Sequence, residues 1–270
     1  MRIEVHRYEL RRRDGGVRRG ALLRVDGVYA DVHPWPELGD APLDEQLSLL
    51  ARGETTQLTR ASLHWATVDA EARKRGVSLF EGLTIPESHW PGAEPPEGFD
   101  TVKTKGVQPV PEHVRIRIDF NARLTAEEFL RVSETLPKER IDFVEDPCPY
   151  DAAVWRDLRE RSGLRLALDR FAGEADVLVH KPVLSADFPL FDGEIVVTSY
   201  MDHPVGQFFA AYVAATHDVA ARCGLMTHLL YEPNAFLERV RRDGARLLPP
   251  GGTGIGFDDL LERLPWTSIG

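Results

Sequence analysis

The stretch Arg115–Pro147 reads RIRIDFNARLTAEEFLRVSETLPKERIDFVEDP and decides the fold. Short β-rich runs at its two ends finish in the carboxylates Asp119 and Glu145. Between them, residues 124–138 carry apolar side chains at the spacing of an amphipathic helix. Strand, helix and strand predict a right-handed βαβ unit with two parallel strands. Both carboxylates would then lie at the carboxyl ends of parallel strands, where α/β folds place their chemistry.

Apolar runs on both sides of this unit extend the pattern. LRLALD ends in Asp169, and DVLVHKP carries Lys181 near its end. Upstream, TVKTKG places Lys103 and Lys105 two residues apart, on one face of a strand. A single acid at a strand end is often only a turn former or a helix N-cap. Three such acids at consecutive strand ends, with lysines on both sides, are harder to explain in that way.

The composition limits the classes of partner. The chain has 270 residues and a formal net charge of −10, which argues against nucleic acid or an anionic membrane as its main partner. It contains no apolar run of membrane-spanning length, and its N-terminus lacks the hydrophobic segment of a signal peptide. Cys148 and Cys223 form neither a disulfide framework nor a zinc motif. These features predict a cytoplasmic, soluble protein.

The order of the expected elements predicts two domains. Residues 1–82 begin with short strands joined by Gly-containing turns and continue with two helices, over 43–52 and 58–75, which indicates an α+β capping domain. Residues 83–231 predict an α/β fold, a modified and shortened (β/α) barrel, with candidate first and last strands at 83–90 and 225–230. We expect the tail, 232–270, to return to the capping domain.

The spacing of the strand ends predicts a barrel that lacks some outer helices. The gap between Lys105 and Asp119, and the gap between Asp169 and Lys181, are each too short for a helix and a strand. The first gap contains two prolines and is expected to be an extended loop that runs back along the strand.

The set of strand-end residues suits abstraction of a proton next to a carboxylate. Asp119, Glu145 and Asp169 supply hard oxygen ligands, which favour Mg²⁺ or Mn²⁺ over zinc. Such an ion leaves positions open for a substrate carboxylate and stabilises the enediolate that forms when the α-proton leaves. A lysine close to other cations can act as the base, because like charge lowers its pKa. The expected partner is therefore a small-molecule carboxylate.

Five motifs together resemble the enolase superfamily, in its muconate-lactonizing subgroup. They are VKTK, RIDFN, FVEDP, ALD and HKP, and they run through most of the barrel region. An α+β capping domain before a modified barrel is also similar to that superfamily. The resemblance implies that Asp119, Glu145 and Asp169 bind the metal, and that Lys105 and Lys181 are the acid/base lysines.

Within this subgroup the chain most resembles the o-succinylbenzoate synthase family. The similar stretches are DVHPWPELGD, residues 31–40, and TSYMDHPVGQ, residues 198–207. The resemblance implies syn-elimination of water from 2-succinyl-6-hydroxy-2,4-cyclohexadiene-1-carboxylate, a step of menaquinone biosynthesis. Lys105 would remove the α-proton and protonate the departing hydroxide, while Lys181 would stabilise the enediolate from the opposite side.

Six further residues are candidates for contact with the substrate. The loop Trp35–Asp40, rich in proline and glycine, is expected to close over the site as an apolar lid. Arg117 lies on the same strand face as Asp119, so it would pair with barrel carboxylates or orient the substrate. For Lys103 we favour a solvated or structural role over a catalytic one. The remaining candidates are Thr198, Ser199 and Gly206, for which a helix N-cap and a turn are equally good explanations.

Two other functions remain open at this point. A racemase of N-acylated amino acids, or a dipeptide epimerase, would use Lys105 and Lys181 as bases on opposite faces of one enediolate. A non-catalytic metal-binding barrel belongs to a different class, and it has no need of lysines on both sides. Exchange of a substrate α-proton with deuterated solvent would separate catalyst from binder, and product analysis would separate dehydration from epimerisation. The sequence does not predict an oligomeric state.

Overall fold

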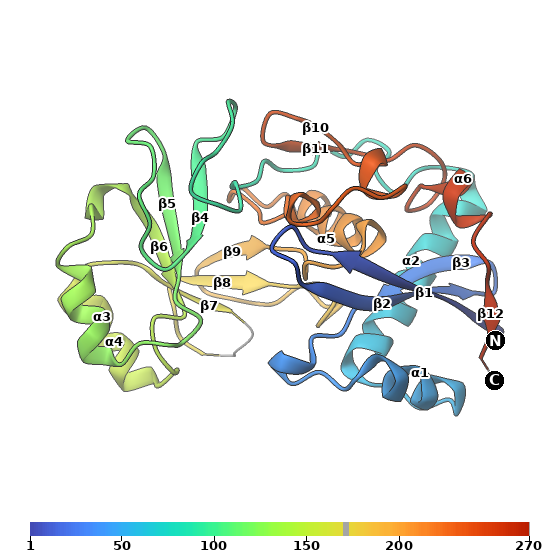
Figure 1. The fold of residues 1–270 in the computed structure, drawn as a ribbon, viewed down its shortest axis with the longest axis horizontal. Helices are drawn as coiled ribbons and strands as arrows, with labels where there is room; N and C mark the ends of the chain where they lie inside the picture. The colour runs from blue at the N-terminus through green and yellow to red at the C-terminus, as the bar shows by residue number, and fades with distance from the viewer. Residues whose placement is uncertain (170–172, 270) are drawn as a thin grey trace.

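The computed structural model describes residues 1–169 and 173–269. Strands from the N-terminal and C-terminal segments form one antiparallel sheet in the order β12-β1-β2-β3 (Figure 1). Its strands are β1 (Ile3–Arg11), β2 (Val17–Val25), β3 (Val28–Val32) and β12 (Thr267–Ser268). The β2–β3 turn uses Asp26 and Gly27, with φ values of 48° and 94°, as a two-residue hairpin requires. The expected meander is confirmed, and the end of the chain adds a strand to it.

Two helices, α1 (Leu43–Ala51) and α2 (Gln57–Arg75), pack against this sheet. At the start of α2, Thr56 and Thr59 form a reciprocal capping box, which satisfies backbone N–H groups at the helix end. At its other end Gly76 has φ 69° and accommodates the left-handed cap. The loop before α1 contains the short 3₁₀ helix η1 (Pro36–Leu38). Both helices lie within about a residue of their predicted bounds.

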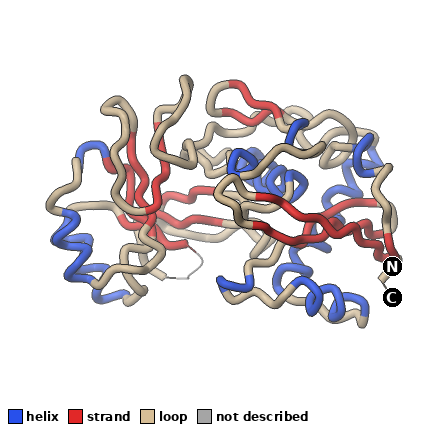
Figure 2. The backbone as a smooth tube through the Cα atoms, in the orientation of Figure 1, coloured by secondary structure: helices blue, strands red, loops and turns tan. Residues whose placement is uncertain are grey.

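The central region forms a six-stranded parallel sheet in the order β4-β5-β6-β7-β8-β9, whose strands are labelled in Figure 1. Figure 2 shows strands in red and helices in blue. Helix α3 connects β5 to β6, α4 connects β6 to β7, and α5 follows β9, so the predicted βαβ unit is confirmed. The arrows of β8 and β9 point toward the antiparallel sheet (Figure 1). The elements are β4 (Thr101–Lys105), β5 (Arg115–Asp119), α3 (Ala126–Ser133), η2 (Lys138–Arg140), β6 (Ile141–Glu145), α4 (Ala152–Ser162), β7 (Leu166–Asp169), β8 (Val177–His180), β9 (Glu194–Val197) and α5 (Pro204–Thr216).

Two connections in this sheet lack the usual helix. The short gap between Lys105 and Asp119 predicted the first of them, between β4 and β5, whereas the second, between β8 and β9, was not predicted. Residues 106–114, between β4 and β5, and residues 181–193, between β8 and β9, are all described and form only turns, bends and irregular loop. The described residues between β7 and β8 also contain no helix. The barrel is therefore shortened on its outside, while its strands remain parallel neighbours.

Single-residue bridges carry the ring of strands from β9 back to β4. Thr198 bridges Gly224, Cys223 bridges Ser88, and Trp90 bridges Val102 of β4, each in parallel orientation. The strands predicted at 83–90 and 225–230 are corrected by this finding. The first is reduced to isolated bridges, and residues 227–230 of the second form the 3₁₀ helix η3 (Thr227–Leu230). A backbone that pairs at only one or two residues leaves no alternating pattern of the kind that predicts a strand.

We call residues 1–82 and 232–270 the cap, and residues 83–231 the barrel. One hydrophobic core joins the two, because side chains of β1–β3, α2, α5 and the tail pack in a single cluster. The tail contains η4 (Leu237–Arg239), β10 (Arg241–Asp243), β11 (Arg246–Leu248) and α6 (Asp258–Leu261) before β12. Among the described residues, no helix combines the length and the apolar character needed to cross a membrane.

Candidate active site

The predicted strand-end residues meet along one edge of the parallel sheet. Lys105 ends β4, Asp119 ends β5 and Glu145 ends β6. Lys105 pairs in register with Asp119, and Asp119 pairs in register with Glu145. Asp169 ends β7, and Lys181 directly follows β8. The order Lys, Asp, Glu, Asp, Lys expected from the sequence therefore runs across five neighbouring strands.

The ammonium group of Lys103, on β4, bridges two of the acids. Its Nζ lies 2.6 Å and 2.7 Å from the carboxylate oxygens of Glu145 and 3.0 Å from Oδ2 of Asp119. Burial disfavours the Lys103 ammonium, but the two carboxylates outweigh that effect and raise its pKa. Lys103 is therefore a fixed cation and a poor general base, in line with the structural role favoured for it.

Lys105 reaches one of these acids, Asp119, from the open side. Its Nζ lies 2.5 Å from Oδ2 of Asp119 and 3.0 Å from Oδ1 of Asn121, and 60% of its side chain is exposed. Burial raises the pKa of Asp119, but the ammonium groups of Lys103 and Lys105 outweigh it and lower that pKa well below the usual range. Asn121 was missed among the candidates, although it ends the RIDFN motif.

Lys181 lies on the other side of the acids and is almost enclosed. It forms an ion pair with Asp169, and only 11% of its side chain is exposed. Burial lowers the pKa of Lys181 to about 8, and the charge of Lys103 acts in the same direction. Because of this shift, both the ammonium and the free amine of Lys181 are accessible near neutral pH.

Asp146 is a second residue that the sequence reasoning missed. It follows Glu145 with φ 43°, and its Oδ1 accepts a hydrogen bond from the Asp169 backbone N–H at 3.1 Å. Burial raises the pKa of Asp146 to about 8, and the charges of Glu145 and Asp119 add to that. Asp146 therefore fixes the backbone that presents Asp169. Its only sequence signal was its place in FVEDP.

The three strand-end acids have the chemistry of a hard-metal site. Asp119 and Glu145 are each 2% exposed, and burial raises the pKa of Glu145, so this pair calls for a positive partner. Lys103 provides one between them. In the described part of the chain, no three His, Cys, Asp or Glu side chains stand close enough to hold an ion as they are. Oxygen-only donors around a site now held by ammonium groups fit Mg²⁺ or Mn²⁺.

Thr198 and Ser199 follow β9, at the same edge of the sheet. Within the described part of the chain, the buried Thr198 Oγ1 has no hydrogen-bond partner, whereas Ser199 Oγ lies 2.5 Å from Thr227 Oγ1. His203 caps α5 through its side chain, so Thr198 and Ser199 are not the N-cap of that helix. Thr198 retains an unused polar group at the site.

Gly206 lies against two buried carboxyl groups where the barrel meets the cap. A Cβ at Gly206 would fall 2.5 Å from Oδ2 of Asp202 and 2.7 Å from Oδ2 of Asp31. Asp31, on β3, accepts hydrogen bonds from Tyr8 Oη at 2.7 Å and from the His203 backbone N–H at 3.2 Å. Only glycine permits this close approach, so Gly206 has a packing role here.

The other member of this carboxyl pair has no such support. Among the described residues, neither carboxylate oxygen of Asp202 has a hydrogen-bond partner. Burial raises the pKa of Asp202 to about 7, and the nearby backbone of Asp202 and Tyr200 offsets this only in part. Burial also raises the pKa of Asp31, and the Asp202 charge adds to it. Two such groups side by side favour a state with a proton on one of them.

Arg117 is buried inside the barrel, two residues before Asp119 on β5. Its Nε donates to Oδ2 of Asp142 at 2.8 Å, and its Nη1 lies 3.0 Å from His89 Nδ1. Nη1 also donates to the Arg222 carbonyl at 2.5 Å, and the guanidinium lies over the Phe143 ring. Two roles were expected for Arg117, pairing with barrel carboxylates or orientation of the substrate. The structure shows a pairing with a barrel carboxylate, Asp142.

Trp35 connects the cap loop to the strand-end segments of the barrel. Its Nε1 donates to the Tyr200 carbonyl at 2.9 Å, and its ring packs with Leu58, Val183 and Tyr200 in one apolar cluster. The guanidinium of Arg18 lies 3.7 Å from the centroid of that ring. The loop thus lies against the segments that follow Lys181 and β9.

Comparisons with known proteins identify the family of this chain. Residues 3–72 match the family model described as O-succinylbenzoate synthase, N-terminal domain. The o-succinylbenzoate synthase of Bdellovibrio bacteriovorus is 35% identical, over 93% of this chain and 92% of that protein. The chain belongs to the o-succinylbenzoate synthase family. This membership agrees with the resemblance to the enolase superfamily that the sequence motifs carry.

Solved structures show that this member of the o-succinylbenzoate synthase family has the expected fold. The L-Ala-D/L-Glu epimerase of Bacillus subtilis matches with a TM-score of 0.74 at 15% identity, over 95% of this chain and 98% of that one. The dipeptide epimerase of Cytophaga hutchinsonii, complexed with Mg and dipeptide D-Ala-L-Val, matches with a TM-score of 0.74 at 14% identity, over 100% and 99%. At such identities the likeness establishes the barrel and cap, not the substrate.

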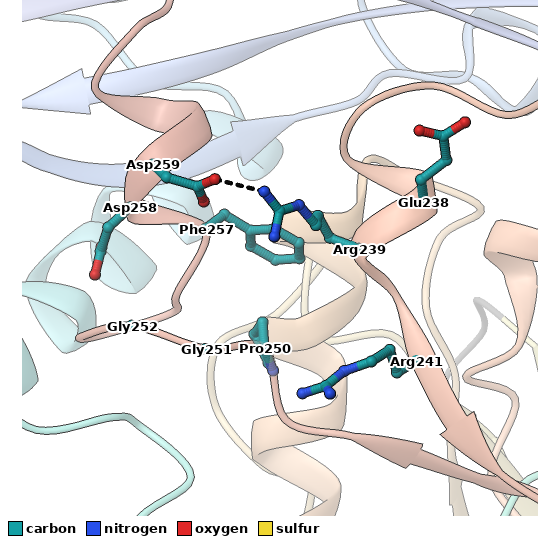
Figure 3. A pocket seen from close by; sticks show the side chains of 9 residues that line it. All are labelled: Glu238, Arg239, Arg241, Pro250, Gly251, Gly252, Phe257, Asp258 and Asp259. Carbon is teal, nitrogen blue, oxygen red and sulfur yellow. Dashed lines mark hydrogen bonds and ion pairs between the residues drawn. The ribbon is translucent and has the colours of Figure 1, made fainter.

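A surface hollow of about 480 Å³ lies elsewhere, in the tail of the cap (Figure 3). Arg239 pairs with Asp259 at 2.6 Å beside it, and the glycines at 251 and 252 form part of its wall. None of the strand-end residues lines it.

Proposed function

We propose that this enzyme is an o-succinylbenzoate synthase, a carbon–oxygen lyase. It eliminates water from 2-succinyl-6-hydroxy-2,4-cyclohexadiene-1-carboxylate to give o-succinylbenzoate, a step of menaquinone biosynthesis. The observation that carries the proposal is the pair of lysines, Lys105 and Lys181, on the two sides of a buried acid cluster. The similarity to the Bdellovibrio bacteriovorus protein over almost the whole chain supports it.

Asp119, Glu145 and Asp169 are the residues that would hold Mg²⁺ or Mn²⁺. When bound, the ion would bind the substrate carboxylate and offset the negative charge that develops as the α-proton leaves. Lys103 would remain beside Asp119 and Glu145, where its raised pKa keeps it charged. Lys103 therefore contributes positive charge at the site and takes no part in proton transfer.

Lys105 is the proposed base. Its exposed side chain can reach a substrate above the strand ends, and the neutral amine takes the α-proton from carbon 1. The electron pair of the broken C–H bond moves toward the substrate carboxylate to give an enediolate, and it then forms the double bond between carbons 1 and 6 as the hydroxyl leaves carbon 6. Lys105, now an ammonium, returns the proton to that hydroxyl, and water departs. One base on one face gives syn-elimination.

Lys181 acts from the opposite side as a cation. Its enclosure strengthens the electrostatic attraction between its ammonium and the carboxylate oxygens that gain charge in the reaction. Thr198 would offer its unused hydroxyl to a substrate oxygen. We propose the Trp35 loop as the apolar wall of the site, since it lies against the segments after Lys181 and β9.

We also propose that the division into cap and barrel is functional. The barrel carries the acids and lysines, and the cap encloses them without supplying chemistry. The free, buried thiols of Cys148 and Cys223 fit a reducing compartment, so we propose a cytoplasmic location. The proposed partner is a small-molecule carboxylate. The direct test is formation of o-succinylbenzoate from the cyclohexadiene substrate, with and without Mg²⁺. A purified enzyme that makes no product with the metal present would contradict the proposal.

The second candidate is epimerisation of N-acylated amino acids or dipeptides. The lowered pKa of Lys181 favours it, because an amine near neutrality could serve as a second base. Proton exchange measured on each enantiomer of an N-succinyl amino acid separates the two functions. If the Lys105 variant still exchanges one enantiomer and the Lys181 variant the other, both lysines are bases.

A further inference from the structure

The turn that carries Lys181 lies in a part of the barrel that has no helix of its own. Leu184 N–H donates to the Lys181 carbonyl at 2.9 Å, which closes a turn directly after β8. In an ordinary βα unit the helix that follows a strand fixes the residues at the strand end. Residues 181–193 form no helix, so another element must hold this turn.

Helix α2 of the cap makes the missing contacts. Trp65 Nε1 donates to the Pro182 carbonyl at 3.2 Å, in a buried position. Gln57 Nε2 donates to the Leu184 carbonyl at 2.7 Å, at the edge of the same surface. Between them, Leu58 packs in the cluster that contains Val183. Two of the three carbonyls that follow Lys181 in this turn are thus bound by one cap helix.

We propose that Trp65 and Gln57 are positioning residues for Lys181, and that α2 replaces the helix that the barrel lacks after β8. The inference rests on the proposed role of Lys181 in dehydration, and it assigns to the cap a part in placing a catalytic group. The ring of Trp65 stacks on Phe209 of α5, with centroids 5.5 Å apart. Phe209 therefore holds the Trp65 indole in place, and the direction of the indole N–H fixes the position of the Pro182 carbonyl in the turn.

The expected effect follows from geometry rather than from binding. Without the indole donor, the buried Pro182 carbonyl loses its partner, and the turn must shift to find another. A displacement of a catalytic group by about 1 Å can reduce a rate by up to 10²-fold. Substrate contacts elsewhere are unchanged, so KM should stay within about twofold while kcat falls.

The test compares two Trp→Phe variants that each lose one indole hydrogen bond to a backbone carbonyl. Trp65→Phe removes the bond to Pro182. Trp266→Phe removes the bond from its Nε1 to the Leu261 carbonyl, 3.0 Å long and far along the cap from the site. For Trp65→Phe we expect kcat for o-succinylbenzoate formation to fall on the order of tenfold. For Trp266→Phe we expect kcat to be unchanged, even if the thermal stability of this variant falls as much as that of Trp65→Phe.

Gln57 provides a variant that does not threaten folding, because its side chain is exposed. Gln57→Glu keeps the length of the side chain but faces the Leu184 carbonyl with an acceptor. Gln57→Ala merely removes the donor. We expect kcat to fall more in Gln57→Glu than in Gln57→Ala. In the double variant with Trp65→Phe, the losses should not add, since both bonds hold one turn.

The outcomes separate this inference from the proposed function. If the wild-type enzyme forms no o-succinylbenzoate with Mg²⁺, the proposed function fails, and with it the role given to Lys181. If the wild type and Trp266→Phe are active and Trp65→Phe has the same kcat as they do, only the positioning role fails. A rise in KM with unchanged kcat in Trp65→Phe would also overturn it.

Discussion

Replacing Asp202 with asparagine should stabilise the protein at pH 8 and leave its stability almost unchanged near pH 4. In the folded protein, burial raises the pKa of Asp202 to about 7, roughly three units above the ~3.9 of an unfolded chain. The folded state therefore keeps a proton that the unfolded state releases as the pH rises from about 4. Stability should fall through that window and level off above about pH 7.

The size of the effect can be estimated from the same shift. Each unit of pKa difference corresponds to about 1.4 kcal/mol, so the penalty above pH 7 is about 4 kcal/mol at most. Asn cannot ionise, so the variant does not carry this penalty at high pH. The free energy of unfolding of the variant should therefore exceed that of the wild type by an amount that grows from near zero at pH 4 to a few kcal/mol at pH 8.

Urea denaturation followed by tryptophan fluorescence at several pH values measures this gap directly. Asp31→Asn is the comparison variant. Asp31 accepts hydrogen bonds from Tyr8 and His203, so near pH 4, where the carboxyl groups are protonated, that substitution should destabilise the protein by about 1–3 kcal/mol. Because burial also raises the pKa of Asp31, this loss should become smaller as the pH rises. A gap for Asp202→Asn that does not change with pH would refute the reasoning, as would a variant less stable than the wild type at pH 8.

The remaining predictions concern the site itself. Lys105→Ala should lower kcat by about 10²–10⁴-fold or more, measured as product formation, with an unchanged circular dichroism spectrum. Lys181→Arg keeps the charge but supplies no neutral base, so a dehydratase should retain some activity and a two-base epimerase none. Lys103→Met should destabilise the metal-free protein by about 3–5 kcal/mol, and Mg²⁺ should restore part of that loss in thermal denaturation. Trp35→Ala should raise KM for the cyclohexadiene substrate, and an unchanged KM would remove the loop from the substrate site.

The strand ends could be predicted because their signals are local. Each acid ends a short apolar run, and neighbouring parallel strands bring their ends together without further information. The cap strands and helices were likewise readable from turns, periodicity and Gly76. The resemblance to known motifs then assigned roles to Lys105 and Lys181 that periodicity alone could not give.

Other features depend on contacts between distant residues, and these leave no local pattern. The bond from Trp65 to Pro182 joins residues separated by 117 positions. The bridges at 88–90 and 223–224 are too short to show alternation. Asn121 and Asp146 both adopt positive φ, and nothing in the neighbouring residues indicates that their side chains turn toward the site. Lys103 could be placed on a face, but not between two particular carboxylates.

The pairing of β1 with β12 has a consequence for the synthesis of the protein. Residues 267 and 268 pair with the edge of β1, and the core of the cap includes Phe257 and Leu261. While the ribosome is still translating the barrel, the first strands have emerged but lack the segment that completes their packing. The barrel sequence leaves the ribosome before that segment. The N-terminal layer is therefore synthesised first but completed last, and a ribosome stalled before the tail would hold a chain with an unfinished cap.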